Sequence, residues 1–111
     1  MKVVEVKNVE SKPNPGVNAR SISDTKDAQV AHIALEPGQG LKKHITAVDV
    51  FFYILEGKVT VEIGDERMEV GPDTLVESPA KIPHRLVNEG NSLGRILVVK
   101  TPRPTEATKV Q

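Results

Sequence analysis

Two histidines that lie forty residues apart, His44 and His84, are the side chains of this chain best suited to chemistry. His44 follows a glycine-rich turn, and His84 follows Pro83. A neutral imidazole binds a divalent transition metal through a ring nitrogen, and it also hydrogen-bonds polar ligands. The sequence contains no cysteine, which excludes thiol catalysis and thiolate metal sites. If the fold brings the two histidines together, they predict a site for zinc, iron, manganese or nickel, or for a small polar molecule.

The elements that must position these histidines are predicted by alternating apolar and polar residues. Residues 58–63 and 67–70 alternate on either side of Gly64-Asp65, which predicts a β-hairpin. No window longer than ten residues carries a helical stripe. Short strands separated by glycine and proline turns are typical of an all-β antiparallel sandwich or barrel. The other strands are expected at residues 28–35, 50–55, 75–76, 85–87 and 95–100.

Length, charge and composition restrict the class of protein. With 111 residues we expect one domain, with a core over about residues 28–100, a loop at 11–16 and an extended tail at 102–111. The 15 basic and 15 acidic residues cancel, so nucleic acid and anionic membranes are not expected partners. No stretch approaches the roughly 20 apolar residues that span a bilayer, and the first residues lack a signal-peptide core. We therefore expect a soluble, cytoplasmic protein.

The motifs around the two histidines resemble those of the cupin family. The first cupin motif places a histidine after a glycine with five residues between them, and it ends near a glutamate-glycine pair. The second motif pairs a proline with a histidine and an asparagine. The matching residues here are Gly38, His44, Tyr53-Ile54-Leu55-Glu56-Gly57, Pro79, His84 and Asn88. The resemblance covers roughly residues 30–100 and implies a double-stranded β-helix, or jelly-roll, barrel.

Three positions depart from the cupin pattern. The second histidine of the first motif falls on Thr46, its glutamate falls on Val50, and a glycine of the second motif falls on Lys81. The family's metal site normally uses three histidines and one carboxylate. The resemblance therefore carries over only His44 and His84 as metal ligands.

A third metal ligand has two candidates in the sequence. A β-bulge that shifts the strand by one residue would turn Asp49 inward and complete a set of two histidines and a carboxylate, as in non-haem iron enzymes. His32 would join His44 if the face of its strand that carries Val30 lines the cavity. The alternation of side chains does not decide which face is inside, so both candidates stay open.

Strand parity also predicts the walls of a ligand pocket. Val50 and Phe52 share one face, and Phe51 and Tyr53 share the other. We expect the first face to line the cavity, while Phe51 and Tyr53 contact a second subunit; the opposite assignment would make Tyr53 an acid in the pocket. The expected pocket consists of His44, Thr46, Val50, Phe52 and His84.

The resemblance to small cupins further implies a homodimer. The alternating run Val3 to Val6 predicts a strand, and residues 1–10 are suitable for exchange between subunits. Two functions remain open for the cavity. One is a metalloprotein or metalloenzyme with His44 and His84 as ligands. The other is a metal-free module for a small polar or anionic molecule or a sugar, or an epimerase-like enzyme.

Overall fold

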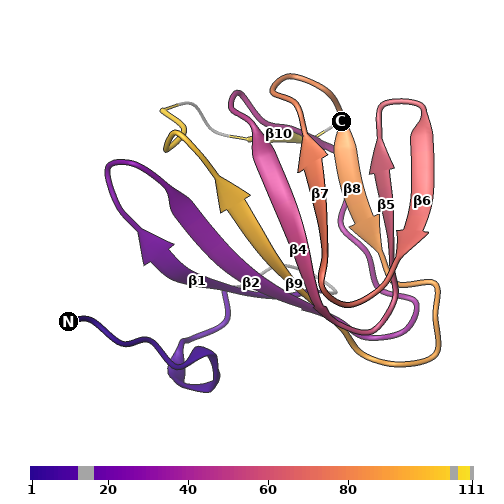
Figure 1. The fold of residues 1–111 in the computed structure, drawn as a ribbon, viewed down its shortest axis with the longest axis horizontal. Coiled ribbons are helices and arrows are strands. Elements are labelled where there is room, and N and C mark those ends of the chain that lie inside the picture. Colours follow the sequence, from indigo (N-terminus) through magenta and orange to yellow (C-terminus); the bar gives the residue numbers. More distant parts are fainter. Residues whose placement is uncertain (13–16, 106–107, 111) are drawn as a thin grey trace.

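The computed structural model describes residues 1–12, 17–105 and 108–110, and it arranges their strands in two five-stranded antiparallel sheets (Figure 1). The expected loop at 11–16 and tail at 102–111 lie partly outside these residues. The first sheet has the order β1 (Asn18–Asp24), β2 (Gln29–Leu35), β9 (Gly94–Lys100), β4 (Val50–Glu56) and β7 (Thr74–Ser78). The second has the order β10 (Lys109–Val110), β3 (His44–Ile45), β8 (His84–Val87), β5 (Val59–Ile63) and β6 (Glu66–Val70).

This topology confirms the predicted all-β, double-stranded β-helix fold, because each sheet combines strands from both halves of the chain. The predicted hairpin is β5–β6, in which Ile63 pairs with Glu66 across Gly64-Asp65. Gly64 has a φ of +57°, as a tight turn with a left-handed first residue requires. The alternation read from the sequence thus marks both the strands and the turn between them.

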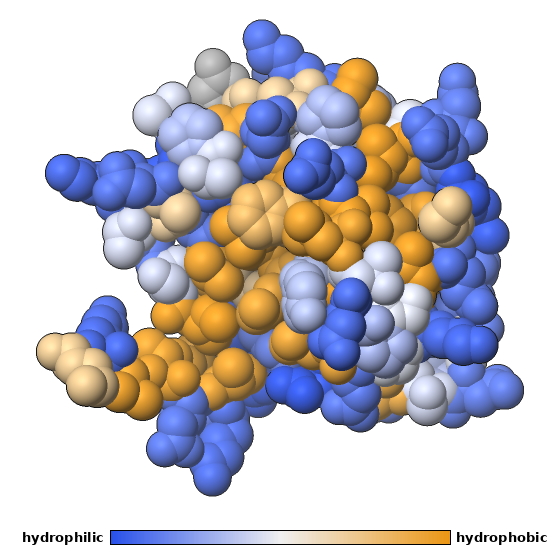
Figure 2. Space-filling model, in the orientation of Figure 1, coloured by the Kyte–Doolittle hydropathy of each residue, from blue (hydrophilic) through white to orange (hydrophobic). Residues whose placement is uncertain are grey.

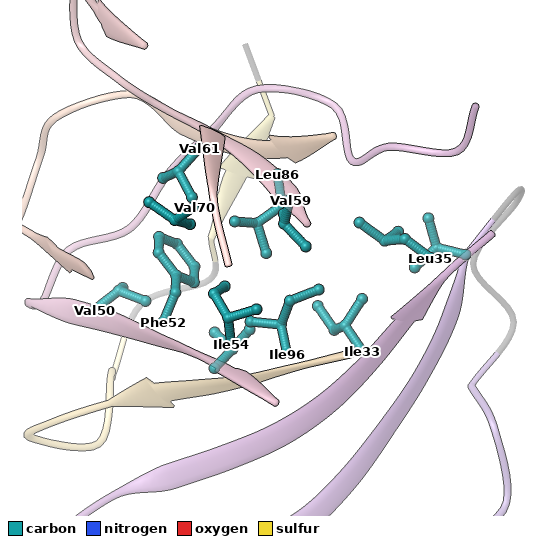
Figure 3. Close-up of a cluster of buried hydrophobic side chains, with 12 residues drawn as sticks. Ile33, Leu35, Val50, Phe52, Ile54, Val59, Val61, Val70, Leu86 and Ile96 are labelled. Carbon is teal, nitrogen blue, oxygen red and sulfur yellow. The ribbon is translucent and has the colours of Figure 1, made fainter. Parts of the chain in front are cut away.

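The core lies between the two sheets and consists of the inward-facing half of each alternating strand (Figure 3). In β4, Val50, Phe52 and Ile54 are buried, while Phe51 and Tyr53 are only partly covered. Burying such side chains contributes roughly 1.5–3 kcal/mol each. The other buried apolar residues are Val17, Ile33, Leu35, Val59, Val61, Val70, Leu86, Ile96 and Val98.

Three strands of the structure have no counterpart in the sequence-based prediction. β1 carries polar residues on both faces, so it lacks the alternation that marks a half-buried strand. β3 and β10 contain two residues each and pair with one another. The sheets therefore extend beyond residues 28–100 at both ends of the chain.

The predicted strand from Val3 to Val6 is wrong for the single chain. Residues 1–5 form no strand, and Val6–Asn8 form a 3-10 helix. The segment extends away from the sheets, with Met1 at its exposed end (Figure 1). In the described part of the chain there is no helix with the length and apolar character needed to cross a membrane.

Candidate functional site

His44 and His84 are brought together by the second sheet. β3 and β8 are antiparallel, and the two histidines are directly opposite partners in their register. They line a cavity of about 210 Å³ between the sheets. Apolar side chains from β2, β4, β8 and β9 form most of its wall. The lining residues are Ala31, Ile33, Leu41, His44, Thr46, Phe52, His84, Arg85, Leu86, Val98, Lys100 and Thr108.

Four of the five residues expected in the pocket line this cavity, namely His44, Thr46, Phe52 and His84. Val50 does not line it. Its side chain is 1% exposed and belongs to the packed core, although it points inward as its parity predicts. Val50 is therefore part of the packed core and not of the cavity wall.

The His84 ring is oriented by two neighbours. Its Nδ1 lies 2.9 Å from the Oγ of Ser78, which is itself buried. The edge of the Phe52 ring meets the His84 ring in a T-shaped contact, with centroids 5.4 Å apart and planes at 84°. Because Ser78 occupies Nδ1, Nε2 is the nitrogen available to a ligand.

Both histidines of the cavity are neutral near pH 7. Burial lowers the pKa of His84 to about 4, and the neighbouring His44 and Lys100 act in the same direction. Burial is also the main cause of the lowered pKa of His44, to which Lys100 adds; a backbone hydrogen bond at Lys42 opposes the shift. Each ring therefore offers one N–H donor and one nitrogen acceptor.

Lys100 is a cavity residue that the sequence-based reasoning missed. It is half-buried at the end of β9, in the inward register of Ile96 and Val98. Its Nζ donates a hydrogen bond to the Thr108 Oγ1 at 3.1 Å. Burial, with a smaller contribution from Lys12, lowers the pKa of Lys100. The alternation of residues 95–100 places Lys100 on the same face as Ile96 and Val98, and this pattern could have identified it.

The prediction that His32 completes the site is wrong. Ala31 and Ile33, its neighbours in β2, line the cavity, so His32 points to the other face of the sheet. There its buried ring accepts a hydrogen bond at Nε2 from the Arg95 Nε at 3.1 Å. Burial, followed by Arg95 and Arg20, lowers the pKa of this histidine.

The prediction that a bulge turns Asp49 toward the histidines is also wrong. Asp49 is exposed, and its Oδ1 accepts a hydrogen bond from the Ala80 N–H at 2.8 Å. The register of β4 is irregular, but between Ile54 and Glu56. Val50 consequently keeps its inward direction, and Asp49 holds the loop that follows β7.

Tyr53 takes the outward direction that was the first expectation. Its hydroxyl donates a hydrogen bond to the Asp73 Oδ1 at 2.9 Å, and the residue does not line the cavity. The alternative in which Tyr53 acts as an acid in the pocket is therefore wrong. Since Tyr53 is the only tyrosine of the chain, a histidine–tyrosine acid–base pair does not form in this cavity.

The loop before β8 is anchored to the site through Lys81. The Lys81 N–H donates to the Thr46 carbonyl at 2.9 Å. Lys81 has a φ of +67°, a left-handed conformation that favours glycine. The cupin pattern places a glycine here, and the lysine therefore adopts this conformation at a cost of roughly 1–2 kcal/mol.

The residues of the cavity do not fit a resident divalent metal. A catalytic zinc or iron site uses three protein ligands or more, usually histidines and carboxylates. Within residues 1–12, 17–105 and 108–110 no group of three or more such side chains converges. The cavity instead combines two imidazoles with the ammonium of Lys100, which opposes a cation.

Comparison with known proteins supports the likeness seen in the motifs. Residues 31–100 match the family model of the cupin domain. An uncharacterised protein of Methanocaldococcus jannaschii is 36% identical over 62 residues, which make up 56% of this chain and 49% of that protein. The match thus spans about half the length of this curated relative.

Solved structures share the fold over nearly the whole chain. A protein of Thermus thermophilus is 32% identical, with a TM-score of 0.82, and the match covers 94% of this chain and 100% of that one. The polyketide cyclase RemF from Streptomyces resistomycificus is 22% identical, with a TM-score of 0.83 and coverage of 99% and 84%. At that identity the second likeness concerns the fold alone.

Proposed function

This chain is a member of the cupin family, and on that premise we propose that it binds a small molecule, without a metal, in the cavity lined by His44 and His84. The observation that carries the proposal is the pairing of these two neutral imidazoles across β3 and β8, at the wall of a cavity whose exposed surface is mostly apolar. The imidazoles supply hydrogen bonds that orient the ligand. The apolar walls bury its body, as is typical of small-molecule sites.

The chemistry of the cavity favours binding over catalysis. His84, oriented by Ser78, can accept or donate one hydrogen bond through Nε2, but Tyr53 lies on the outer face and cannot act as its acid–base partner. The apolar wall also favours a ligand with a compact apolar body over a sugar, whose hydroxyl groups need many polar partners. The fold itself hosts unrelated activities and does not choose among them.

A fragment screen followed by two-dimensional NMR tests this function. Ligands should shift the signals of residues around the cavity, and His84→Asn or His44→Ala should weaken their binding by about tenfold, because each change removes a directed hydrogen bond. His32→Asn is the matched control, since His32 lies on the outer face, and it should leave affinity unchanged. In a separate thermal melt, added zinc, iron(II), manganese or nickel should not raise the melting temperature of the protein.

Two results would contradict the proposal. One is a screen in which no compound shifts the signals of the cavity residues. The other is a ligand whose affinity is the same in the wild type, His44→Ala and His84→Asn. If the wild type takes up one equivalent of metal and both cavity variants do not, the chain is better interpreted as a metalloprotein.

We further propose that two copies of the chain pair through the outer face of the first sheet. The outward side chains Phe51 and Val99 are neighbours in the register of β4 and β9, and Val30 adjoins Val99 from β2. Figure 2 shows apolar surface over this part of the molecule, and also on the projecting N-terminal segment. In that segment Met1 is fully exposed and Val3 is 75% exposed. These side chains could cover the outer face of a second copy.

Sedimentation velocity tests the dimer. Phe51→Glu places a charge in the proposed interface and should shift the protein to monomers. Met68→Glu is the matched control, because Met68 is 67% exposed on β6 of the second sheet; this variant should sediment as the wild type does. Deletion of residues 1–5 should weaken the dimer. A wild type that sediments as a monomer at every concentration rules the pairing out.

A further inference from the structure

One cavity wall carries a charge opposite to the one that the cupin motif would place there. Val50 occupies the position of the motif's glutamate. Its cross-strand partner in β9 is Lys100, whose side chain lines the cavity. The substitution removes an anionic metal ligand, and the neighbouring strand adds a cation. This wall therefore attracts anions and repels cations.

The surroundings of Lys100 leave its charge available to a ligand. Its Nζ donates to the neutral hydroxyl of Thr108, just before β10. No ion pair that involves Lys100 is found in the described part of the chain. Burial lowers the pKa of Lys100, which reflects the cost of withdrawing an ammonium group from water. An anionic ligand group beside Nζ would offset that cost.

Thr46 provides an independent observation that also points to a ligand. It lines the same cavity and is 1% exposed, and its Oγ1 is a buried polar atom without a hydrogen-bond partner among the described residues. An unpaired buried hydroxyl destabilises the folded protein, so native structures usually give it a partner. A ligand oxygen in the cavity would be such a partner. Thr46 stands where the cupin motif has its second histidine.

We propose that the cavity recognises a small monocarboxylate, whose carboxylate accepts hydrogen bonds from the Lys100 Nζ and the Thr46 Oγ1 while its apolar body packs against Phe52 and Leu86. The inference rests on the proposed binding function and adds the chemical class of the ligand. A ring with one acid group suits the size, because a cavity of about 150 Å³ holds benzene and this one measures about 210 Å³. On binding, the carboxylate replaces Thr108 as the partner of Lys100.

Three probes of nearly equal shape test the charge preference directly. Benzoate carries the carboxylate, benzamide is its uncharged counterpart, and benzylammonium carries the opposite charge. Titration of the wild type, followed by NMR, should show benzoate binding at least about tenfold more tightly than benzamide, because its hydrogen bond to Lys100 is charge-assisted. Benzylammonium should not bind.

Two variants then assign the effect to residues. Lys100→Met keeps an unbranched side chain that is one atom shorter and removes its charge, so benzoate affinity should fall about tenfold, to that of benzamide. Thr46→Val should weaken benzoate by a smaller factor. Lys58→Met is the matched control, since Lys58 is exposed in the turn between β4 and β5, and it should change nothing. Thermal melts of each variant establish that it is folded.

The outcomes separate this inference from the proposed function. Equal affinity for benzoate and benzamide, or a Lys100→Met variant that still prefers benzoate, overturns carboxylate recognition. If benzamide binding nevertheless falls in His84→Asn, the cavity remains a small-molecule site for a neutral ligand. If benzoate does not bind at all while neutral fragments do, the inference fails and the proposed function stands.

Discussion

Acidification from pH 6.5 toward pH 4 is expected to lower the free energy of unfolding by about 3 kcal/mol through His84 alone. Burial holds the pKa of His84 near 4, whereas in the unfolded chain it returns to its usual 6.5. Between these values the unfolded chain binds a proton that the folded protein does not. The contribution to stability is therefore complete above pH 6.5 and is lost as the pH falls through this window.

Urea unfolding at a series of pH values measures this effect in the wild type and in His84→Asn. The variant lacks the titrating group, so the difference in stability between the two proteins should shrink by about 3 kcal/mol between pH 6.5 and pH 4. The variant also serves as the control for the carboxylates and other histidines, which titrate in both proteins. A His84 ring that titrates near pH 6.5 by NMR would refute the prediction.

Replacement of Asn88 by alanine is expected to cost about 3 kcal/mol of stability, because three hydrogen bonds of a fully buried side chain are lost. The Asn88 Nδ2 donates to the carbonyls of Leu35 and Ser92, each at 2.8 Å, and its Oδ1 accepts from the Gly90 N–H at 2.9 Å. The backbone of Asn88 also pairs with Gly38 and Gln39. The residue thus ties together the ends of β2 and β8 and the loop that leads to His44.

Asn91→Ala is the matched control for this substitution. Asn91 lies in the same loop as Ser92, but its side chain is exposed, so the change should alter stability by no more than about 0.5 kcal/mol. Thermal and urea unfolding of both variants provide the comparison. An Asn88→Ala protein as stable as Asn91→Ala would show that these bonds contribute nothing net to the fold.

The hydrogen bonds of Asn88 give this residue of the second cupin motif a structural role. Asn88 serves the backbone and not the cavity, and Gly57, from the first motif, has a similar structural role. Gly57 has a φ of +76°, and a Cβ there would lie 2.2 Å from the Leu93 carbonyl oxygen. Such positions maintain the barrel whatever its cavity binds. The fold therefore does not depend on metal ligands at the positions of Thr46 and Val50, where the resemblance would place them.

Most strands could be predicted from the sequence because each is a local pattern. The hairpin at residues 59–70 alternates clearly, residues 50–55 form a short continuous apolar run rich in strand formers, and glycine or proline follows both. β1 could not be predicted, because it is an edge strand with polar residues on both faces. β3 and β10 are too short to carry any period. They are defined by their pairing with each other and not by their own residues.

By itself the sequence determined that His44 and His84 flank the strands of a cupin barrel, because turn residues, alternation and motif spacing are local properties of the chain. Only the tertiary structure decided what surrounds them. The alternation of side chains along a strand defines two faces, but it does not say which face points into the barrel. The packing of the sheets turned His32 outward and Lys100 inward. The cavity therefore contains the ammonium group of Lys100 and lacks the imidazole of His32. This positive charge is the physical basis of the anion site proposed for the cavity.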